Sequence, residues 1–299
     1  MALIEVNYIP MKKTPQTLKP SRRVRHEHFR EGHLARGLCY LAEETALEII
    51  INGLSYNLLM QTPGHEQELV IGFLYTEGLI EAPEQVKSLV IQKGPGFLGI
   101  SGVEARVHLP GMENQDTLPE RISLSLSSCG LCGKESLDQV GRGIRRVRSK
   151  QHFSWETLSG LLADLRRHQP LYEQTKGVHA AAMYEADGSF VCCFEDVGRH
   201  NALDKVIGHC LKQEVSFHDK LIVLSGRASL EMILKTARAG IPLFLCFSNP
   251  TTLAIEAAKS LNITLVSREE GRSLVGYTHT RRLELDSAAS TPSRPNNGV

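Results

Sequence analysis

The pattern that most constrains the fold lies in the second half of the chain, where short apolar runs alternate with amphipathic segments of helical length. Runs of strand type occur at 221–224, 243–247 and 263–266, and the segments 229–239 and 252–261 between them have the length and spacing of helices. Strands that alternate with helices in this way favour right-handed crossovers and parallel pairing. The sequence therefore predicts an α/β core with a largely parallel sheet.

A smaller β-rich lobe is predicted ahead of this core. Apolar runs at 46–51 and 54–59 flank Asn52-Gly53, a dipeptide that tolerates the positive φ angles of a tight hairpin turn. The segment from Glu66 to Tyr75 has the apolar spacing of a helix, and short runs of strand type follow from Val86 to Leu109. We therefore expect a hairpin, a helix and further strands in this lobe.

These patterns divide the chain into four parts. A helix from Ser154 to His168 and a hairpin around Asp187-Gly188 are expected ahead of the alternating strands. The N-terminal end is basic with little apolar periodicity, and the C-terminal end is rich in Ser, Ala, Pro and Asn. The predicted division is a basic, poorly ordered arm at 1–40, a β-rich lobe that ends in a cysteine loop at 41–150, an α/β domain at 151–285 and a disordered tail at 286–299.

Charge and hydropathy argue against two classes of partner. The chain of 299 residues has 34 basic and 33 acidic side chains, and a net charge of +1 gives no electrostatic reason to bind nucleic acid or an acidic membrane surface. No segment reaches the roughly 18 uncharged apolar residues that a membrane-spanning helix needs, and the first residues do not have the pattern of a secretory signal. We expect a cytoplasmic protein.

Two cysteines stand three positions apart in the glycine-rich segment Cys129-Gly130-Leu131-Cys132-Gly133. A structural zinc site needs four ligands, and the other five cysteines offer no second pair at this separation. A dithiol oxidoreductase would place the pair at the start of a helix, whereas this segment has the composition of an exposed loop. Such a loop suits a thiolate that accepts sulfur as a persulfide, and Lys134 favours the thiolate. The other cysteines are expected to be buried apolar residues.

Three polar turns follow predicted strands, at 195–201, 225–229 and 248–252. In an open sheet the carboxyl ends of the strands form the ligand-binding crevice, and helix N-termini with arginines favour phosphate. We therefore expect a phosphorylated ligand, such as a nucleotide, although Ser229 and Thr251 could simply cap helices. The sequence contains neither a Walker loop nor a dinucleotide-binding fingerprint. The candidate crevice residues are His179, Arg199, His200, Ser225, Arg227 and Ser248.

Several of these segments together resemble a known family. They are Ser128-Cys129-Gly130-Leu131-Cys132-Gly133, Gly177-Val178-His179-Ala180-Ala181, the block from Glu195 to Lys205, Ser225-Gly226-Arg227-Ala228-Ser229 and Tyr277-Thr278. The chain from about Thr45 to Thr278 resembles the formate dehydrogenase accessory sulfurtransferase family, FdhD.

The resemblance implies a fold, an activity and a set of partners. It implies a cytidine-deaminase-like α/β core with a smaller N-terminal β-rich lobe, a cytoplasmic location and a homodimer. A cysteine desulfurase would load sulfur onto the protein, which would deliver it to the molybdenum bis(molybdopterin guanine dinucleotide) cofactor of apo-formate dehydrogenase. This cofactor would be a bound substrate, and no permanent metal is expected.

Residue roles carry over from the family by position. Cys129 would carry the persulfide, with Cys132 as its partner. The segment that would contact the cofactor comprises Arg268, Glu269, Glu270, Gly271, Arg272 and Ser273. Zinc deaminase chemistry is not expected, because Ala181 stands where those enzymes have a catalytic glutamate and the cysteine pair precedes His179. Two other functions stay open, namely a cofactor-holding chaperone for the apo-enzyme with structural cysteines and a zinc-stabilised binding module.

Overall fold

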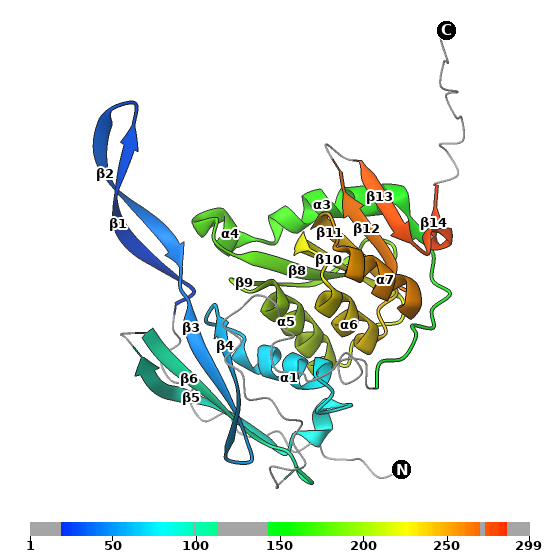
Figure 1. The fold of residues 1–299 in the computed structure, drawn as a ribbon, viewed down its shortest axis with the longest axis horizontal. Helices are drawn as coiled ribbons and strands as arrows, with labels where there is room; N and C mark the ends of the chain where they lie inside the picture. The colour runs from blue at the N-terminus through cyan, green and yellow to red at the C-terminus, as the bar shows by residue number, and fades with distance from the viewer. Residues whose placement is uncertain (1–18, 98–99, 113–142, 270–272, 286–299) are drawn as a thin grey trace.

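The N-terminal lobe is a four-stranded sheet covered by one helix (Figure 1). The computed structural model describes residues 19–97, 100–112, 143–269 and 273–285. The sheet has the order β4-β3-β6-β5, with β3 and β6 parallel and the other pairs antiparallel. Its elements are β3 (Thr45–Ile51), β4 (Leu54–Gln61), α1 (Glu66–Thr76), β5 (Ser88–Phe97) and β6 (Ile100–His108). The predicted hairpin at Asn52-Gly53 is confirmed, and both residues have positive φ angles, of 48° and 87°.

The C-terminal part is built on a six-stranded sheet of order β13-β12-β11-β10-β8-β9. Its strands are β8 (His179–Glu185), β9 (Phe190–Asp196), β10 (Lys220–Arg227), β11 (Leu243–Ser248), β12 (Thr264–Arg268) and β13 (Leu274–Thr278). Only the pairs β10–β11 and β11–β12 are parallel, and the three outer pairs are antiparallel. The prediction of an α/β core is confirmed, but the prediction of a largely parallel sheet is wrong, because a hairpin turn rather than a helix connects β8 to β9, β8 pairs antiparallel with β10, and β12 pairs antiparallel with β13.

Helices cover both faces of this sheet. The longer ones are α3 (Trp155–Arg167), α5 (Arg199–Lys212), α6 (Leu230–Ala239) and α7 (Thr252–Leu261), and α4 (Pro170–Thr175) is a single short turn. Leucines of α3 pack against one face, while α5, α6 and α7 pack against the other. The predicted start of a helix at Ser154 is confirmed, and its hydroxyl caps the helix by accepting a hydrogen bond from the Thr157 N–H at 3.2 Å. A two-stranded ladder of β7 (Phe153–Ser154) and β14 (Leu283–Glu284) and the short 3₁₀ segments η1 (Pro83–Gln85) and η3 (Thr280–Arg282) complete the described elements.

A long hairpin replaces most of the arm that was predicted to be poorly ordered. The strands β1 (Ser21–Arg30) and β2 (His33–Ala42) pair antiparallel over their full length and project from the body (Figure 1). They are joined at Glu31-Gly32, where both residues have positive φ angles, of 52° and 82°. The prediction for 1–40 is therefore wrong from residue 21 onward, while 1–18 and the predicted tail at 286–299 lie outside the described residues. In the described part of the chain, no helix is long and apolar enough to cross a membrane.

The two lobes meet where α1 crosses α5 at two glycines. A Cβ atom placed on Gly72 would lie 1.9 Å from the carbonyl oxygen of Asp204, and one placed on Gly208 would lie 1.9 Å from that of Glu68. Neither distance is possible for real atoms, so only glycine allows the two backbones to approach this closely. The contact thus fixes the distance between the helices, and with it the position of the N-terminal lobe.

A buried ion pair lies beside this helix crossing. The Lys235 ammonium donates hydrogen bonds to both carboxylate oxygens of Asp204, at 2.8 and 3.0 Å, and to the Thr76 hydroxyl at 2.9 Å. Burial alone would lower the pKa of Lys235, but the carboxylates of Asp204 and Glu77 more than offset this and hold its pKa above the ordinary value. The lysine of α6 thereby stays charged and links α5 to the end of α1.

Candidate functional site

Three of the six predicted crevice residues, His179, Ser225 and Ser248, line cavities at one edge of the six-stranded sheet. In the strand register Asp196 lies opposite His179, Leu224 lies opposite Ala181, and Arg227 lies opposite Ser248. The carboxyl ends of β9, β10, β11 and β12 therefore share this edge with the start of β8. The Ser225 hydroxyl accepts a hydrogen bond from the Ala180 N–H at 2.8 Å, which joins two of the predicted segments directly.

The first cavity at this edge, here called the Gln169 cavity, lies between α4 and the start of β8. It has a volume of about 360 Å³. Its polar lining combines two residues that the sequence predicted, His179 and Ser225, with four that it did not: Arg166, Gln169, Tyr172 and Lys176. No motif marks these four residues, and the only signal in the sequence is a cluster of polar side chains around Pro170, between a predicted helix and a predicted strand.

The second cavity, here called the Ser248 cavity, lies at the ends of β11 and β12. It has a volume of about 800 Å³, and its lining includes the predicted residues Ser248, Arg268 and Glu269. Phe247, Asn249, Val275 and Tyr277 complete the lining among the described residues. The Arg166 guanidinium lies 5.6 Å from the centre of the Phe247 ring, and the Arg268 guanidinium lies 5.9 Å from it. Since Arg166 also lines the Gln169 cavity, the two cavities adjoin.

The described walls of the two cavities are rich in cations. Arg166 lies 4.6 Å and Lys176 lies 5.2 Å from the centre of the Tyr172 ring, so both are within the distance of a cation–π interaction with it. Arg268 adds a third cation, against the single carboxylate of Glu269. Burial, and then the nearby Arg199 guanidinium, lower the pKa of His179, so that this residue is neutral near pH 7. The crevice is therefore suited to an anionic ligand.

Three predicted crevice residues are placed differently. His200 is largely buried, with its Nε2 atom 3.3 Å from Glu231 Oε2. Burial and then Arg199 lower the pKa of His200 to about 3, which keeps its ring neutral. Arg199 packs with His179 over Gly226, and Arg227 is exposed at the end of β10. Among the described residues none of these three lines either cavity, which leaves them at the margin of the site.

Of the cofactor-contacting segment predicted at 268–273, the structure describes Arg268 at the end of β12, then Glu269, and Ser273 just before β13. The Glu269 N–H donates to the Ser273 carbonyl at 2.8 Å, and both residues are exposed. The run at 263–266 was the last strand that the sequence predicted, but β13 follows the segment 268–273 in the chain and pairs with β12. Glu270, Gly271 and Arg272 lie outside the described residues.

The turn at 195–201 contributes to the site mainly by positioning α4. The Glu195 carboxylate accepts hydrogen bonds from the Leu171 and Tyr172 N–H groups, at 2.8 and 2.7 Å. It thereby anchors the start of α4, which forms one wall of the Gln169 cavity. Although these N–H groups favour the carboxylate, burial raises the pKa of Glu195 above its ordinary value.

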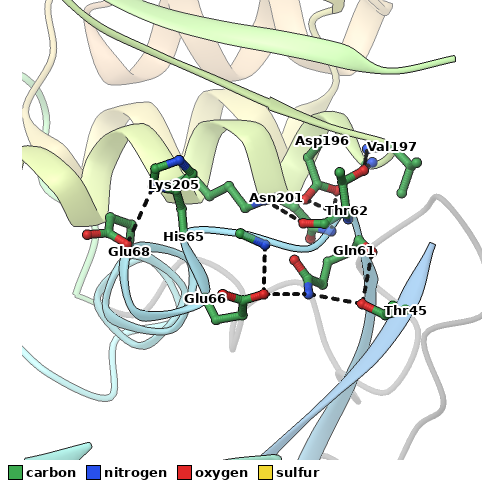
Figure 2. A network of polar contacts seen from close by, with 12 residues as sticks. Thr45, Gln61, Thr62, His65, Glu66, Glu68, Asp196, Val197, Asn201 and Lys205 are labelled. Carbon is green, nitrogen blue, oxygen red and sulfur yellow. Dashed lines mark hydrogen bonds and ion pairs between the residues drawn. The ribbon is translucent and has the colours of Figure 1, made fainter. Parts of the chain in front are cut away.

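The next residue, Asp196, is fully buried and connects the two lobes (Figure 2). Its carboxylate contacts the Lys205 ammonium at 2.7 Å and accepts hydrogen bonds from the Thr62 N–H at 3.1 Å and the Asn201 amide at 2.9 Å. Lys205 also donates to the Thr62 carbonyl at 2.9 Å. The expectation that this polar turn faces a ligand is therefore wrong for Asp196 and Asn201, whose polar atoms are directed at the N-terminal lobe.

None of the five described cysteines lines either cavity. Cys192, Cys210 and Cys246 are buried as predicted, whereas Cys39 and Cys193 are only half-buried. Burial raises the pKa of Cys246 to about 12 and also raises that of Cys193, while the neighbouring Cys192 thiol and then burial raise the pKa of Cys210. Cys39 lies on the projecting hairpin. Cys129 and Cys132 lie outside the described residues.

The described part of the chain contains no cluster of potential metal ligands. No group of three or more His, Cys, Asp or Glu side chains there has the arrangement of a metal site. Because the Cys129–Cys132 pair is not among those residues, the prediction that the protein carries no permanent metal stays a prediction.

Comparison with known proteins gives a consistent assignment. A sequence model of the FdhD/NarQ family matches residues 42–284. The sulfur carrier protein FdhD of Nocardia farcinica is 37% identical over 259 residues, which cover 84% of this chain and 90% of that protein. The protein of the same name from Sulfolobus acidocaldarius is 34% identical, over 88% of this chain and 99% of its own length.

A crystal structure of a protein from Desulfotalea psychrophila shares the fold. That protein is described provisionally as a formate dehydrogenase accessory protein, and it superimposes with a TM-score of 0.69 at 23% sequence identity. The match covers 88% of this chain and 99% of the other. The family match over most of the length, the relatives above 30% identity and the shared fold agree, and the chain therefore belongs to the FdhD/NarQ family.

Proposed function

We propose that this chain is a sulfur carrier whose Cys129 accepts sulfur from a cysteine desulfurase and passes it to the molybdenum bis(molybdopterin guanine dinucleotide) cofactor of formate dehydrogenase. The observation that carries the proposal is the state of the described cysteines. Family members are named sulfur carriers, and a sulfur carrier requires a reactive thiol. Burial raises the pKa of Cys193 and Cys246, and the Cys192 thiol followed by burial raises the pKa of Cys210, so the thiolate is disfavoured at all three. The Cys129–Cys132 pair is the best candidate for the reactive thiol.

The proposed loading step needs no external oxidant. The Cys129 thiolate attacks the outer sulfur of the persulfide on the desulfurase, and a new S–S bond forms at Cys129. The S–S bond on the desulfurase breaks at the same time, and the desulfurase cysteine leaves as a thiolate. Transfer to the cofactor would then break the S–S bond at Cys129 and regenerate its thiol, and a reduced molybdenum centre would supply the two electrons that convert the outer sulfur to a sulfido ligand.

The cationic crevice supports the second half of this proposal. A guanine dinucleotide carries a diphosphate, and Arg166, Lys176 and Arg268 provide three cations across two adjoining cavities. The sequence contains no Walker loop with its phosphate-binding lysine, so the site would hold the nucleotide without hydrolysing it. In this account the protein works in the cytoplasm as a homodimer with a cytidine-deaminase-like core, and it meets the desulfurase and apo-formate dehydrogenase in turn.

GDP offers a direct test of the crevice. Arg268→Ala is expected to weaken GDP binding at least about tenfold, because removing a charged hydrogen-bond partner costs about 1.5 to 3 kcal/mol. Isothermal titration calorimetry of both proteins measures the change. Arg281→Ala is the matched control, since Arg281 is an exposed arginine of η3 that lines neither cavity. Equal GDP affinity of the Arg268→Ala variant and the parent would contradict the proposed crevice.

Activation of the client enzyme separates the sulfur carrier from the chaperone alternative, which the same crevice would also serve. If the protein carries sulfur, Cys129→Ala should leave apo-formate dehydrogenase inactive in the presence of a desulfurase and cysteine. Cys39→Ala should activate it as the parent does, because Cys39 lies on the hairpin, before the region that matches the family. A chaperone with structural cysteines would instead activate the enzyme without any desulfurase. One zinc ion per chain, lost on Cys132→Ser, would favour the binding module.

A further inference from the structure

The side chain of Gln169 presents an unusual combination of burial and missing partners. It is 1% exposed, and neither its Oε1 nor its Nε2 atom has a hydrogen-bond partner. An amide that is buried in this way loses its hydrogen bonds to water and gains none from the protein. Such a group in a native structure calls for an explanation, and a bound ligand is one. Gln169 lines the cavity named after it.

Local structure explains why no part of the chain uses this amide. Gln169 stands at the N-cap of α4 but makes no capping hydrogen bond with its side chain. The next residue, Pro170, has no N–H to offer, and the following N–H groups of Leu171 and Tyr172 are already taken by the Glu195 carboxylate. Glu195 therefore performs the capping that Gln169 would otherwise perform. The amide therefore lies in the wall of the cavity with both its donor and its acceptor unused.

The chemistry of an amide restricts the ligand group that can satisfy it. An amide presents one acceptor and one donor side by side, so its partner must place a donor next to an acceptor. The diphosphate of a dinucleotide has acceptors only and cannot satisfy both atoms. Planar heterocycles with an N–H beside a C=O do match, and a volume of about 360 Å³ is within the range of small-ligand sites. Val178, Val197 and Tyr172 provide apolar wall, while Arg166 and Lys176 suit an anionic substituent on the ring.

We propose that Gln169 binds the edge of a 2-amino-4-oxopyrimidine ring, the ring that guanine and pterins share, and that the Gln169 cavity is the base-recognition subsite of the crevice. The inference rests on the proposed function, since the molybdopterin guanine dinucleotide contains this ring in both its guanine and its pterin. The amide would accept from the ring N–H and donate to the adjacent carbonyl. Gln169 thus recognises the base, while the three cations of the crevice bind the diphosphate.

Two substitutions at Gln169 test this by calorimetry with GDP, ADP and pterin-6-carboxylate as probes. Gln169→Leu removes both hydrogen bonds and should lower the affinity for the ligand that occupies the subsite at least about tenfold. Loss of GDP affinity alone assigns the subsite to guanine, and loss of pterin affinity alone assigns it to the pterin. Gln169→Glu only accepts hydrogen bonds, which suits the ring N–H and the 2-amino group but not the acceptor N1 of adenine. The ratio of GDP to ADP affinity, or of pterin to ADP affinity, should therefore rise at least about tenfold.

Stability of the ligand-free protein distinguishes this role from a structural one. If the amide serves only the ligand, Gln169→Leu should raise the Tm by about 2 to 4 °C, because an unsatisfied buried amide is replaced by an apolar side chain. A lower Tm with unchanged affinities for all three probes would show that Gln169 is structural and would overturn the proposal. Failure of the parent to bind GDP and the pterin would also overturn it. Sulfur loading of Cys129 would then still test the proposed function independently.

Discussion

Replacing Gly208 with alanine is expected to lower the free energy of unfolding by at least about 3 kcal/mol, at the upper end of the range for overpacked sites. The added Cβ would lie 1.9 Å from the Glu68 carbonyl oxygen and 2.7 Å from the Gly72 nitrogen. Both are backbone atoms, so no side chain can turn away to relieve the clash. The helices α1 and α5 must separate, and the apolar contacts between the lobes loosen with them. Urea denaturation followed by circular dichroism measures the loss.

A glycine in another helix provides the matched control. Gly160 is an exposed residue of α3, and a Cβ atom placed on it meets nothing within 4 Å. Gly160→Ala should therefore raise the free energy of unfolding by about 0.5 to 1 kcal/mol, the intrinsic helical advantage of alanine over glycine. If Gly208→Ala stabilises the protein in the same way, the close approach of α1 and α5 is not present in solution.

Replacing Lys205 with methionine is expected to cost about 3 to 5 kcal/mol, because it leaves the Asp196 carboxylate buried without its counter-ion. The ammonium and the carboxylate lie 2.7 Å apart, with side-chain exposures of 1% and 0%. The substitution also removes the donor to the Thr62 carbonyl, so that α5 loses a direct contact with the N-terminal lobe (Figure 2). Methionine has nearly the length of lysine, which limits the change in packing. Chemical denaturation of the purified variant gives the free energy directly.

Two further variants separate the buried charge from the loss of a lysine. Lys212→Met removes a lysine from the same helix, where its partner Glu68 is 2.6 Å away and the lysine side chain is 28% exposed. A partly solvated pair of this kind contributes at most about 1 kcal/mol. Adding Asp196→Asn to Lys205→Met removes the unpaired charge and should recover part of the loss. If both lysine variants were equally mild, the pair would not hold the lobes together.

Elements with strong local signals could be predicted from the sequence. Asn52-Gly53, Asp187-Gly188 and the Ser154 N-cap each specify a turn or a helix start through one or two residues, and the structure has all three. The alternation of strands and helices from Leu221 to Val266 correctly predicted the parallel pairs at the centre of the sheet, since it is also a local pattern. Hydrophobic periodicity and turn chemistry are local properties, and they need no knowledge of the rest of the chain.

Strands that lack an apolar face escaped this reasoning. β1 carries four arginines and two histidines rather than a buried stripe, so that its composition resembled a solvated arm. Only the Glu31-Gly32 turn signalled a hairpin. β13 is short and half-buried at the edge of its sheet, and its pairing with β12 reverses the direction that the helix–strand alternation predicted.

The site could be predicted in part because topology brings the carboxyl ends of strands together. Ser225, Ser248 and Arg268 reached the crevice in this way, and His179 reached it from the start of the antiparallel strand β8. The block from Glu195 to Lys205 was misinterpreted because the Thr62 partner of Asp196 lies 134 residues earlier in the chain. Gln169 was missed because its significance depends on a distant carboxylate that occupies the N-terminus of α4.

The central claim, that Cys129 carries sulfur, is tested most directly by the intact mass of the whole protein after incubation with a cysteine desulfurase and cysteine. We expect the parent and Cys39→Ala to gain the mass of one sulfur atom and to lose it again on reduction with a thiol, since a persulfide is cleaved by thiolates. Cys129→Ala should show no gain. A Cys129→Ala variant that is labelled as fully as the parent would contradict the account.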